Sequence, residues 1–205
     1  MADMGAFRDA VTGWVAGGSG ESARELADRL PVRVVVLLEG PSDAAAVTAL
    51  AARRGRDLAA DGICVLPMGG AMNVGHFARL LGPPGLGLRL TGMCDEAEYR
   101  YYVRGLERAG APWHGVQVCV ADLEEELIRA LGVTRVKDLV RAEGDLRPLE
   151  IFLGQPAQRD RTPQQQLRRF LGTKKGRKIH YGRLLAEALD PDQVPAPLKG
   201  LLASL

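Results

Sequence analysis

Four short apolar runs, each followed by a stretch of helical character, constrain how this chain can fold. The runs are rich in valine, leucine and isoleucine and span residues 32–39, 62–67, 86–95 and 115–122. Apolar runs of this length that end in glycine or polar residues are typical of buried strands. Because strands that alternate with helices form βαβ units, this order predicts an α/β fold with a parallel sheet covered on both faces.

The helical stretches between these runs are indicated by their periodicity and by their first residues. We predict helices at residues 42–54, with Ser42 as the N-cap, within 69–82 after a glycine loop, at 96–109 and at 123–131. Each stretch is long enough to cross from one strand to the next strand of a parallel sheet.

Both ends of the chain differ from this alternating middle. Two short helices are predicted at residues 6–16 and 21–30, around a Gly-Gly-Ser-Gly break. After Gly132 no further strand is predicted, and prolines interrupt a series of helices. The length of 205 residues suits one domain with an appendage. We therefore divide the chain into an N-terminal helical segment (1–30), a central α/β domain (31–132) and a helical, basic C-terminal region (133–205).

Composition excludes several classes of protein. With 46% hydrophobic and 25% charged residues, the chain can fill a core and is not globally disordered. The first residues do not form a secretory signal and no apolar stretch reaches about 20 residues, so we expect a cytoplasmic protein without a membrane span. The three cysteines lack metal-binding spacing and are predicted to be buried free thiols. The net charge of +2 is too small to indicate a partner.

Carboxylates gather at the predicted carboxyl ends of three strands. In a parallel sheet these ends meet at one edge, where such folds bind ligands. Several carboxylates at one place repel one another unless cations neutralise them, and hard oxygen ligands suit Mg²⁺ or Mn²⁺. The sequence therefore predicts a metal site at this edge. The candidate ligands are Glu39 and Asp43 after the first strand, Asp95 after the third, and Asp122 and Glu124 after the fourth.

An acid in the first turn of a helix can also do no more than complement the helix dipole. This simpler explanation suits Glu125 and Glu126, which we predict to lie on a solvated helix face. It suits Glu39 less well, because this residue directly ends an apolar strand before a tight Gly-Pro turn, where a charge requires a reason. The metal-site hypothesis therefore rests on the three strand ends taken together.

Four segments of the chain resemble a known family. The sequences LLEGPSD, GGAMN, GMCDEAE and VADLEEEL are similar to the Toprim domain, in particular to the nuclease domain of the overcoming-lysogenization-defect (OLD) family. The resemblance covers about residues 32–131 and continues weakly into the helical tail. It implies a Rossmann-like Toprim fold with about four parallel strands. It also implies metal-dependent chemistry at phosphodiester bonds, with two Mg²⁺ or Mn²⁺ ions.

The resemblance assigns roles to the acids at the strand ends. Glu39 matches the family's glutamate after the first strand, a catalytic and metal-binding position. Asp43 matches the second metal-binding acid four residues further on. Asp95 matches the first acid of the family's DxD motif, and Asp122 with Glu124 matches the later acidic pair.

The resemblance also implies a catalytic lysine near the scissile phosphate. Lys178, which precedes an amphipathic helix, is our candidate for it, and Lys174 and Lys175 are the alternatives. A lysine there neutralises the charge that builds on the phosphoryl oxygens.

Two features depart from the family. Ala97 replaces the second acid of the DxD motif, and Glu98 comes one residue too late, which on an α-helix turns it about 100° away. One metal ion is therefore expected to be held more weakly or by a rearranged set of ligands. Second, OLD nucleases usually carry an ATPase domain ahead of the Toprim domain, and this chain has only about thirty residues there. The ATPase would be absent or supplied in trans.

Positive charge is concentrated in residues 155–183, which hold nine lysines and arginines against one acid, Asp160. Such a segment attracts a polyanion through counterion release. A solvated helix surface with partners at i,i+4 spacing is the alternative, but acidic partners are missing within this segment. Because aromatic residues are few, we expect contact with a nucleic-acid backbone without reading of bases. The predicted nucleic-acid-binding residues are Arg168, Arg169, Lys174, Lys175 and Arg177.

These observations lead to one main hypothesis and two alternatives. The main hypothesis is a Mg²⁺- or Mn²⁺-dependent, endonuclease-like phosphodiesterase whose expected substrate is DNA. The first alternative is a catalytically weak Toprim module that binds nucleic acid or a partner ATPase, consistent with Ala97. The second alternative is a hydrolase or transferase of small nucleotides. The choice between DNA and RNA stays open, and so does a homodimer.

Overall fold

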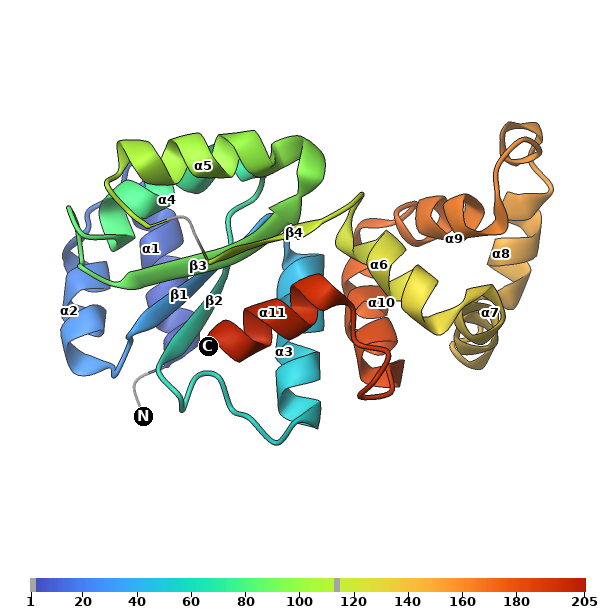
Figure 1. Ribbon diagram of the computed structural model, residues 1–205, viewed down its shortest axis with the longest axis horizontal. Helices are drawn as coiled ribbons and strands as arrows, with labels where there is room; N and C mark the ends of the chain where they lie inside the picture. The colour runs from blue at the N-terminus through green and yellow to red at the C-terminus, as the bar shows by residue number, and fades with distance from the viewer. Residues whose placement is uncertain (1–2, 113–114) are drawn as a thin grey trace.

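The computed structural model describes residues 3–112 and 115–205, except for the side chain of Lys175. Within these residues, four parallel strands form one sheet in the order β2-β1-β3-β4 (Figure 1). This confirms the predicted α/β fold with a parallel sheet. The strands are β1 (Val34–Leu38), β2 (Ile63–Pro67), β3 (Arg89–Asp95) and β4 (Val116–Cys119).

The strand order reverses at β1. The chain passes from β1 to β2 on one side of it, and then crosses to β3 on the other side. Val36 of β1 accordingly lies opposite both Val65 of β2 and Thr91 of β3. The crevice outside the carboxyl ends of the strands at such a reversal is where open α/β sheets bind ligands.

The two faces of the sheet bury different cores, because successive strand residues point to opposite sides. In β1, Val35 and Leu37 contribute to one core, whereas Val34, Val36 and Leu38 contribute to the other. All five residues are buried. The uninterrupted apolar run in the sequence therefore reflects a sheet that is covered on both faces.

Helices from the N-terminal half of the chain cover the first core. In Figure 1, α1 and α2 lie at one end, and α4 and α5 lie side by side above the strands. Phe7 of α1, Phe77 of α4 and Tyr102 of α5 are buried together in this core. The elements are α1 (Met4–Val15), α2 (Glu21–Arg29), the 3₁₀-helix η1 (Ala71–Asn73), α4 (Val74–Leu81) and α5 (Tyr99–Arg108).

The second core is covered by α3 and by two helices from the C-terminal part of the chain. α10 packs along α3, and α11 returns to the sheet beside β4 (Figure 1). Gly182 of α10 allows a close approach, since a Cβ there would lie 2.8 Å from the carbonyl oxygen of Ser42. Helices of all three predicted segments share these cores, and the boundaries at residues 30 and 132 stay predictions. The helices are α3 (Pro41–Arg53), α10 (Lys175–Ala188) and α11 (Ala196–Ser204).

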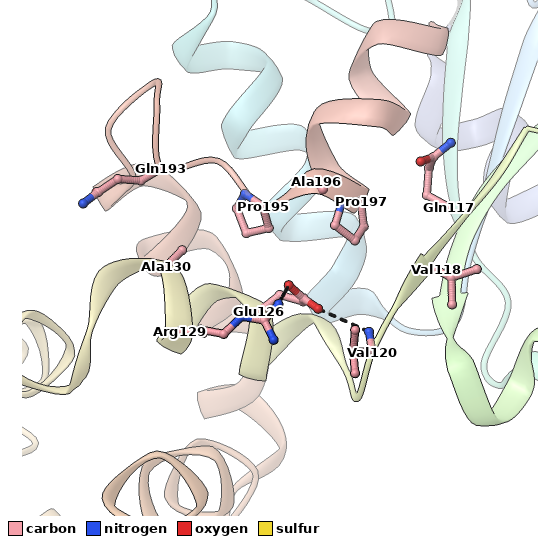
Figure 2. A pocket seen from close by; sticks show the side chains of 10 residues that line it. All are labelled: Gln117, Val118, Val120, Glu126, Arg129, Ala130, Gln193, Pro195, Ala196 and Pro197. Atoms are coloured by element: carbon pink, nitrogen blue, oxygen red, sulfur yellow. Dashed lines mark hydrogen bonds and ion pairs between the residues drawn. The ribbon is translucent and has the colours of Figure 1, made fainter.

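Further helices lie beyond the β4 edge, at the right of Figure 1. A cavity of about 460 Å³ separates β4, α6 and α11 (Figure 2). Glu126 lines this cavity and is buried. Its carboxylate accepts a hydrogen bond from the Val120 backbone N–H (3.2 Å) and pairs with Arg129, and these contacts compensate the burial of its charge. The prediction that Glu126 lies on a solvated face is therefore wrong. The elements are α6 (Leu123–Leu131), α7 (Val133–Ala142), α8 (Leu146–Leu153), the 3₁₀-helix η3 (Pro156–Gln158) and α9 (Pro163–Leu171).

The cysteines are buried and free, as predicted: Cys64, Cys94 and Cys119. Burial raises the pKa of Cys64 to about 12, so this thiol stays protonated at neutral pH.

In the described part of the chain, none of the helices has the length and apolar character that a membrane crossing requires.

Candidate metal centre

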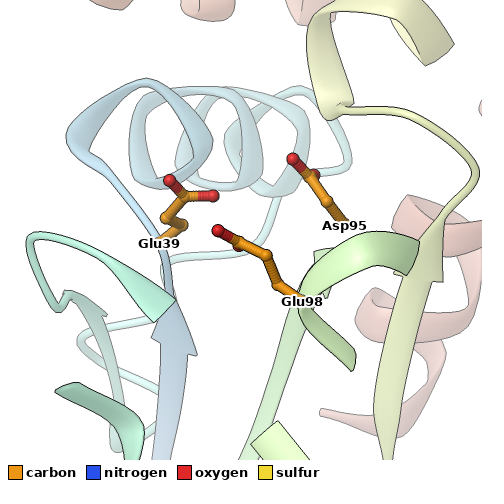
Figure 3. A group of neighbouring side chains, drawn as sticks. All are labelled: Glu39, Asp95 and Glu98. Carbon is orange, nitrogen blue, oxygen red and sulfur yellow. The ribbon is translucent and has the colours of Figure 1, made fainter. Parts of the chain in front are cut away.

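The carboxylates of Glu39, Asp95 and Glu98 point toward one another at the carboxyl edge of the sheet (Figure 3). One carboxylate oxygen of each residue lies within 4.8 Å of the other two. Glu39 follows β1 and Asp95 ends β3, so the two strands at the reversal deliver them. One divalent cation can bridge this acidic triad, because Mg²⁺ and Ca²⁺ bind oxygens at about 2.0–2.6 Å.

The position of Glu98 corrects the expectation that it turns away from the site. Residues Glu96–Glu98 form a 3₁₀-helix, η2, with Asp95 as its N-cap. Three residues complete one turn of a 3₁₀-helix, so side chains three apart lie above one another. Asp95 and Glu98 therefore share a face, and Ala97 is exposed beside them. The spacing of three residues between Asp95 and Glu98 is the sequence signal for this arrangement. The same spacing occurs in an α-helical turn, so the sequence alone does not distinguish the two.

Burial and repulsion by neighbouring carboxylates raise the pKa of two triad members, Asp95 and Glu98. Burial raises the pKa of Asp95 to about 7, and the carboxylates of Glu39 and Asp122 add to this rise. Burial also raises the pKa of Glu98 to about 7, assisted by Glu39 beside it. The Oε2 oxygen of Glu98 is shielded from solvent and meets no hydrogen-bond donor among the described residues. A buried acceptor without a donor fits a cation ligand, so the triad fits Mg²⁺ or Mn²⁺.

Asp43 lies near the triad in the first turn of α3. The helix begins at Pro41 with Gly40 as its N-cap, and the predicted cap at Ser42 is wrong. Proline suits this first position because its missing N–H would be unpaired there. Asp43 consequently accepts a hydrogen bond from the backbone N–H of Gly40 (2.9 Å). Burial, followed by the charge of Glu124, raises the pKa of Asp43 to about 7.

Glu124 is buried and forms an ion pair with Lys178 of α10. The Lys178 Nζ lies 3.3 Å from Oε2 of Glu124, and 47% of the lysine side chain is exposed. Burial raises the pKa of Glu124, and the lysine partly offsets this rise. Burial lowers the pKa of Lys178, but Glu124 and Asp43 outweigh it, so the pKa is raised and the ammonium stays charged. α10 thus brings the candidate catalytic lysine next to the acids.

Asp122 is the N-cap of α6, and both of its carboxylate oxygens have partners. Oδ1 accepts from the backbone N–H of Glu125 (2.8 Å), and Oδ2 accepts from Nε of Arg168 (2.6 Å). Its charge nevertheless contributes to the raised pKa of Asp95. Of the five predicted ligands, the structure brings two into the triad and places three around it. Those in the triad are Glu39 and Asp95, and those around it are Asp43, Asp122 and Glu124.

The family model that matches this chain is the Toprim domain of overcoming-lysogenization-defect-like proteins, over residues 32–96. The matched segment includes both β1 and β3, with Glu39, Asp43 and Asp95. Residues 32–96 thus match an OLD-like Toprim domain. A comparison with curated proteins found no match to this chain.

Solved structures similar to this chain are C-terminal regions of OLD proteins. That of Xanthomonas campestris pv. campestris, phased with mercury, is 24% identical with a TM-score of 0.63, over 84% of this chain and 93% of the other. That of Burkholderia pseudomallei is 21% identical with a TM-score of 0.62, over 84% of this chain and 96% of the other. At these identities the likeness concerns the fold, and it confirms the predicted Toprim fold with its helical C-terminal part.

A cavity of about 690 Å³ near the metal centre is lined by both acidic and basic side chains. Asp122 and Glu124 line it together with Lys178, Arg168 and Arg169. Arg168 and Lys178 pair with the two acids, so two cations of the basic segment have acidic partners outside the segment. Their partners come from α6, far away in the sequence, and Arg169 stays exposed at the surface.

Arg177 differs from the other predicted nucleic-acid-binding residues. Its side chain is 7% exposed, and its guanidinium donates to both carboxylate oxygens of Asp145 at 3.1 Å and lies over the Phe170 ring. These contacts occupy the guanidinium inside the protein, and the contact of Arg177 with nucleic acid stays a prediction. Lys174 is exposed at the N-cap of α10, whereas the side chain of Lys175 lies outside the described residues.

Proposed function

We propose that this chain is a metal-dependent nuclease that hydrolyses phosphodiester bonds in DNA. The acidic triad of Glu39, Asp95 and Glu98 carries the proposal, with three carboxylates gathered at the strand reversal. One of them, Glu98, has a buried oxygen without a hydrogen-bond donor in the described residues. The match of residues 32–96 to an OLD-like Toprim domain supports the same class of reaction.

The proposed cation ligands fall into two groups. Two divalent ions bound there would supply activation of a water molecule and stabilisation of the leaving oxygen in an in-line displacement. The chain itself holds the carboxylates together on rigid strand ends, at an electrostatic cost that the raised pKa values of Asp95 and Asp43 record. Glu39, Asp95 and Glu98 would hold one ion, and Asp43, Asp122 and Glu124 are the candidates for a second.

Lys178 is the proposed group that neutralises charge on the phosphoryl oxygens. Its ammonium is held at the acids by Glu124, yet nearly half of the side chain is exposed and open to a phosphate. A positive charge at this place stabilises the transition state more than the ground state. Arg168, Arg169 and Lys174 lie on the adjacent surface and are proposed to contact the DNA backbone.

A second candidate function is a catalytically weak Toprim module that binds nucleic acid or a partner ATPase. Ala97 favours it, because this residue stands where the family has the second acid of the DxD motif. Glu98 argues for catalysis, because its carboxylate lies with Glu39 and Asp95 despite the alanine. The two candidates differ in whether divalent cations support cleavage.

Incubation of the purified protein with supercoiled plasmid tests the proposal. Mg²⁺ or Mn²⁺ should support nicking or linearisation, and EDTA should stop it. Glu39→Gln should abolish cleavage, because glutamine keeps the shape of the side chain but removes the charge that holds the cation. Undiminished cleavage by Glu39→Gln would point to a contaminant or another site. Failure of the wild type to cut with either metal would favour the binding module.

A further inference from the structure

A groove of about 440 Å³ runs between α4 and α5, on the face of the sheet opposite α3. Basic side chains line it from both helices: His76 and Arg79 from α4, and Arg104 and Arg108 from α5. All four are exposed. Arg104 and Arg108 are four residues apart, so they project from the same face of α5. Among the described residues, none of those that line the groove is acidic.

Two glycines bring the helices together beneath this groove. A Cβ at Gly105 of α5 would lie 2.6 Å from a methyl carbon of Val74 and 3.2 Å from the Cα of Gly75 on α4. The two backbones can therefore approach closely only because neither glycine carries a side chain. The longer arginine side chains on both sides then form the walls of a shallow channel.

The arginines of the groove differ in their partners from those of the basic segment. Among the described residues, no carboxylate lies at ion-pair distance from Arg79, Arg104 or Arg108. Arg168 and Arg177, in contrast, pair with aspartates. Guanidinium groups that remain free of carboxylates and line one channel suit phosphates, which they bind through paired N–H donors.

The end of the groove at Met72 and Tyr101 lies near the starts of α4 and α5, which follow the carboxyl ends of β2 and β3. The backbone N–H of Gly70, in the loop before α4, donates to the carbonyl of Glu39 (3.0 Å). Tyr101, which lines the groove, follows three residues after Glu98. From Glu98 to Arg108 the chain advances roughly 15 Å at 1.5 Å per helical residue. This length spans about four nucleotides of a DNA strand at about 3.4 Å each.

We propose that the α4–α5 groove binds the phosphate backbone of DNA on one side of the scissile bond. The inference rests on the nuclease function proposed above, and it adds a second phosphate-binding surface to that of Arg168 and Arg169. The α4–α5 groove lies over one face of the sheet, whereas Arg168 and Arg169 lie on α9 beyond the β4 edge (Figure 1). The acidic triad lies at the carboxyl ends of the strands. DNA that passes the acidic triad would then contact the α4–α5 groove on one side of it and Arg168 and Arg169 on the other.

Binding of a short fluorescein-labelled DNA duplex, measured by fluorescence anisotropy in EDTA, tests the groove without cleavage. The variant Arg79→Ala/Arg104→Ala/Arg108→Ala should bind more weakly than the wild type. Each lost phosphate contact should reduce the slope of log affinity against log salt by about 0.9, so the triple variant should lose up to about 2.7. A matched control, Arg24→Ala/Arg29→Ala/Arg54→Ala, removes the same charge from α2 and the end of α3 and should keep most of the slope.

The outcomes separate the groove from the nuclease function. A groove variant with the affinity and slope of the control variant would overturn the groove, and so would a wild type that binds no DNA at low salt. Plasmid cleavage by the wild type is scored independently. If the wild type never cuts but its DNA binding depends on the three arginines, the nuclease proposal fails and the groove is supported. Melting curves by circular dichroism check that both variants are folded, as exposed substitutions should be.

Discussion

The ammonium nitrogen of Lys178 lies 3.3 Å from a carboxylate oxygen of Glu124, which ties α10 to the first turn of α6. Glu124 is 5% exposed, whereas Lys178 is 47% exposed. The buried carboxylate therefore fixes the position of a charge that still faces solvent. A lysine held in this way can meet a phosphate at the acidic edge of the sheet without first being ordered.

Lys178→Ala should lower the rate of cleavage by more than it lowers affinity for DNA, because its charge matters most in the transition state. Single-turnover cleavage at saturating protein measures the rate, and anisotropy in EDTA measures the affinity. Lys199→Ala, which removes an exposed lysine from α11, is the matched control. A Lys178→Ala protein that cleaves at the wild-type rate once saturated would make Lys178 a phosphate anchor, and Lys174 would then be the next candidate.

Glu98→Gln should weaken Mn²⁺ binding by at least about tenfold. Loss of groups that merely orient metal ligands already costs about 10–100-fold in affinity, and Glu98 is proposed to be a direct ligand. Isothermal titration with Mn²⁺ measures the effect without any nucleic acid. Glu96→Gln removes an exposed carboxylate from the same 3₁₀-helix and should leave the affinity nearly unchanged. Equal affinities of the two variants would exclude Glu98 from the metal centre.

The stability of the metal-free protein should fall as the pH rises from about 4 to about 7. The pKa of Asp43 is about 7 in the folded protein against an ordinary value of 3.8, because burial disfavours its charge. The folded state therefore binds more protons than the unfolded state in this range, and each rise in pH favours unfolding. Thermal melts in EDTA at several pH values follow this trend.

Asp43→Asn isolates the contribution of that one carboxylate. The asparagine oxygen can still accept the hydrogen bond from Gly40, but the side chain never becomes charged. The variant should melt above the wild type at pH 8, and the difference should shrink as the pH falls toward 4. A difference in melting temperature that does not change with pH would show that the charge of Asp43 is not its origin.

Arg177→Ala should lower the free energy of unfolding by about 3 kcal/mol, since it breaks a largely buried ion pair and leaves Asp145 without its guanidinium. Arg169→Ala, on the exposed surface of α9, should change it by less than about 0.5 kcal/mol. Urea denaturation of both variants provides the comparison. Two equally small changes would mean that the pair with Asp145 adds little to stability.

The sheet and its acidic edge could be predicted because local pattern encodes them. β1 is a run of five buried residues, and Glu39 follows it at once, so the strand and its exit are both visible in the sequence. α6 was predicted at residues 123–131 and is found at Leu123–Leu131, since an aspartate cap and a terminal glycine mark its ends. The parallel order then brings Glu39 and Asp95 to one edge.

The remaining features depend on contacts between distant segments or on small differences in helix geometry. The position of Glu98 follows from one 3₁₀ turn, which has the same residue pattern as an α turn. The partner of Arg177 is Asp145 before α8, and the partner of Arg168 is Asp122 before α6. A count of charges along the sequence includes all of these residues but does not show which of them form ion pairs. The arginines of the basic segment were therefore expected to be free of ion pairs, although two of them pair with distant aspartates.

The close approach of Gly182 to the backbone of Ser42 makes the position of α10 depend on that of α3. α3 carries Asp43 at the metal centre, and α10 carries Lys178 one turn before Gly182, so a methyl group at position 182 would shift both functional groups relative to each other. The segment recognisable as a Toprim domain, residues 32–96, ends before this partner helix. Any exchange of C-terminal helices between relatives must therefore keep α3 and α10 matched, and residues 32–96 cannot be transplanted alone as a working site.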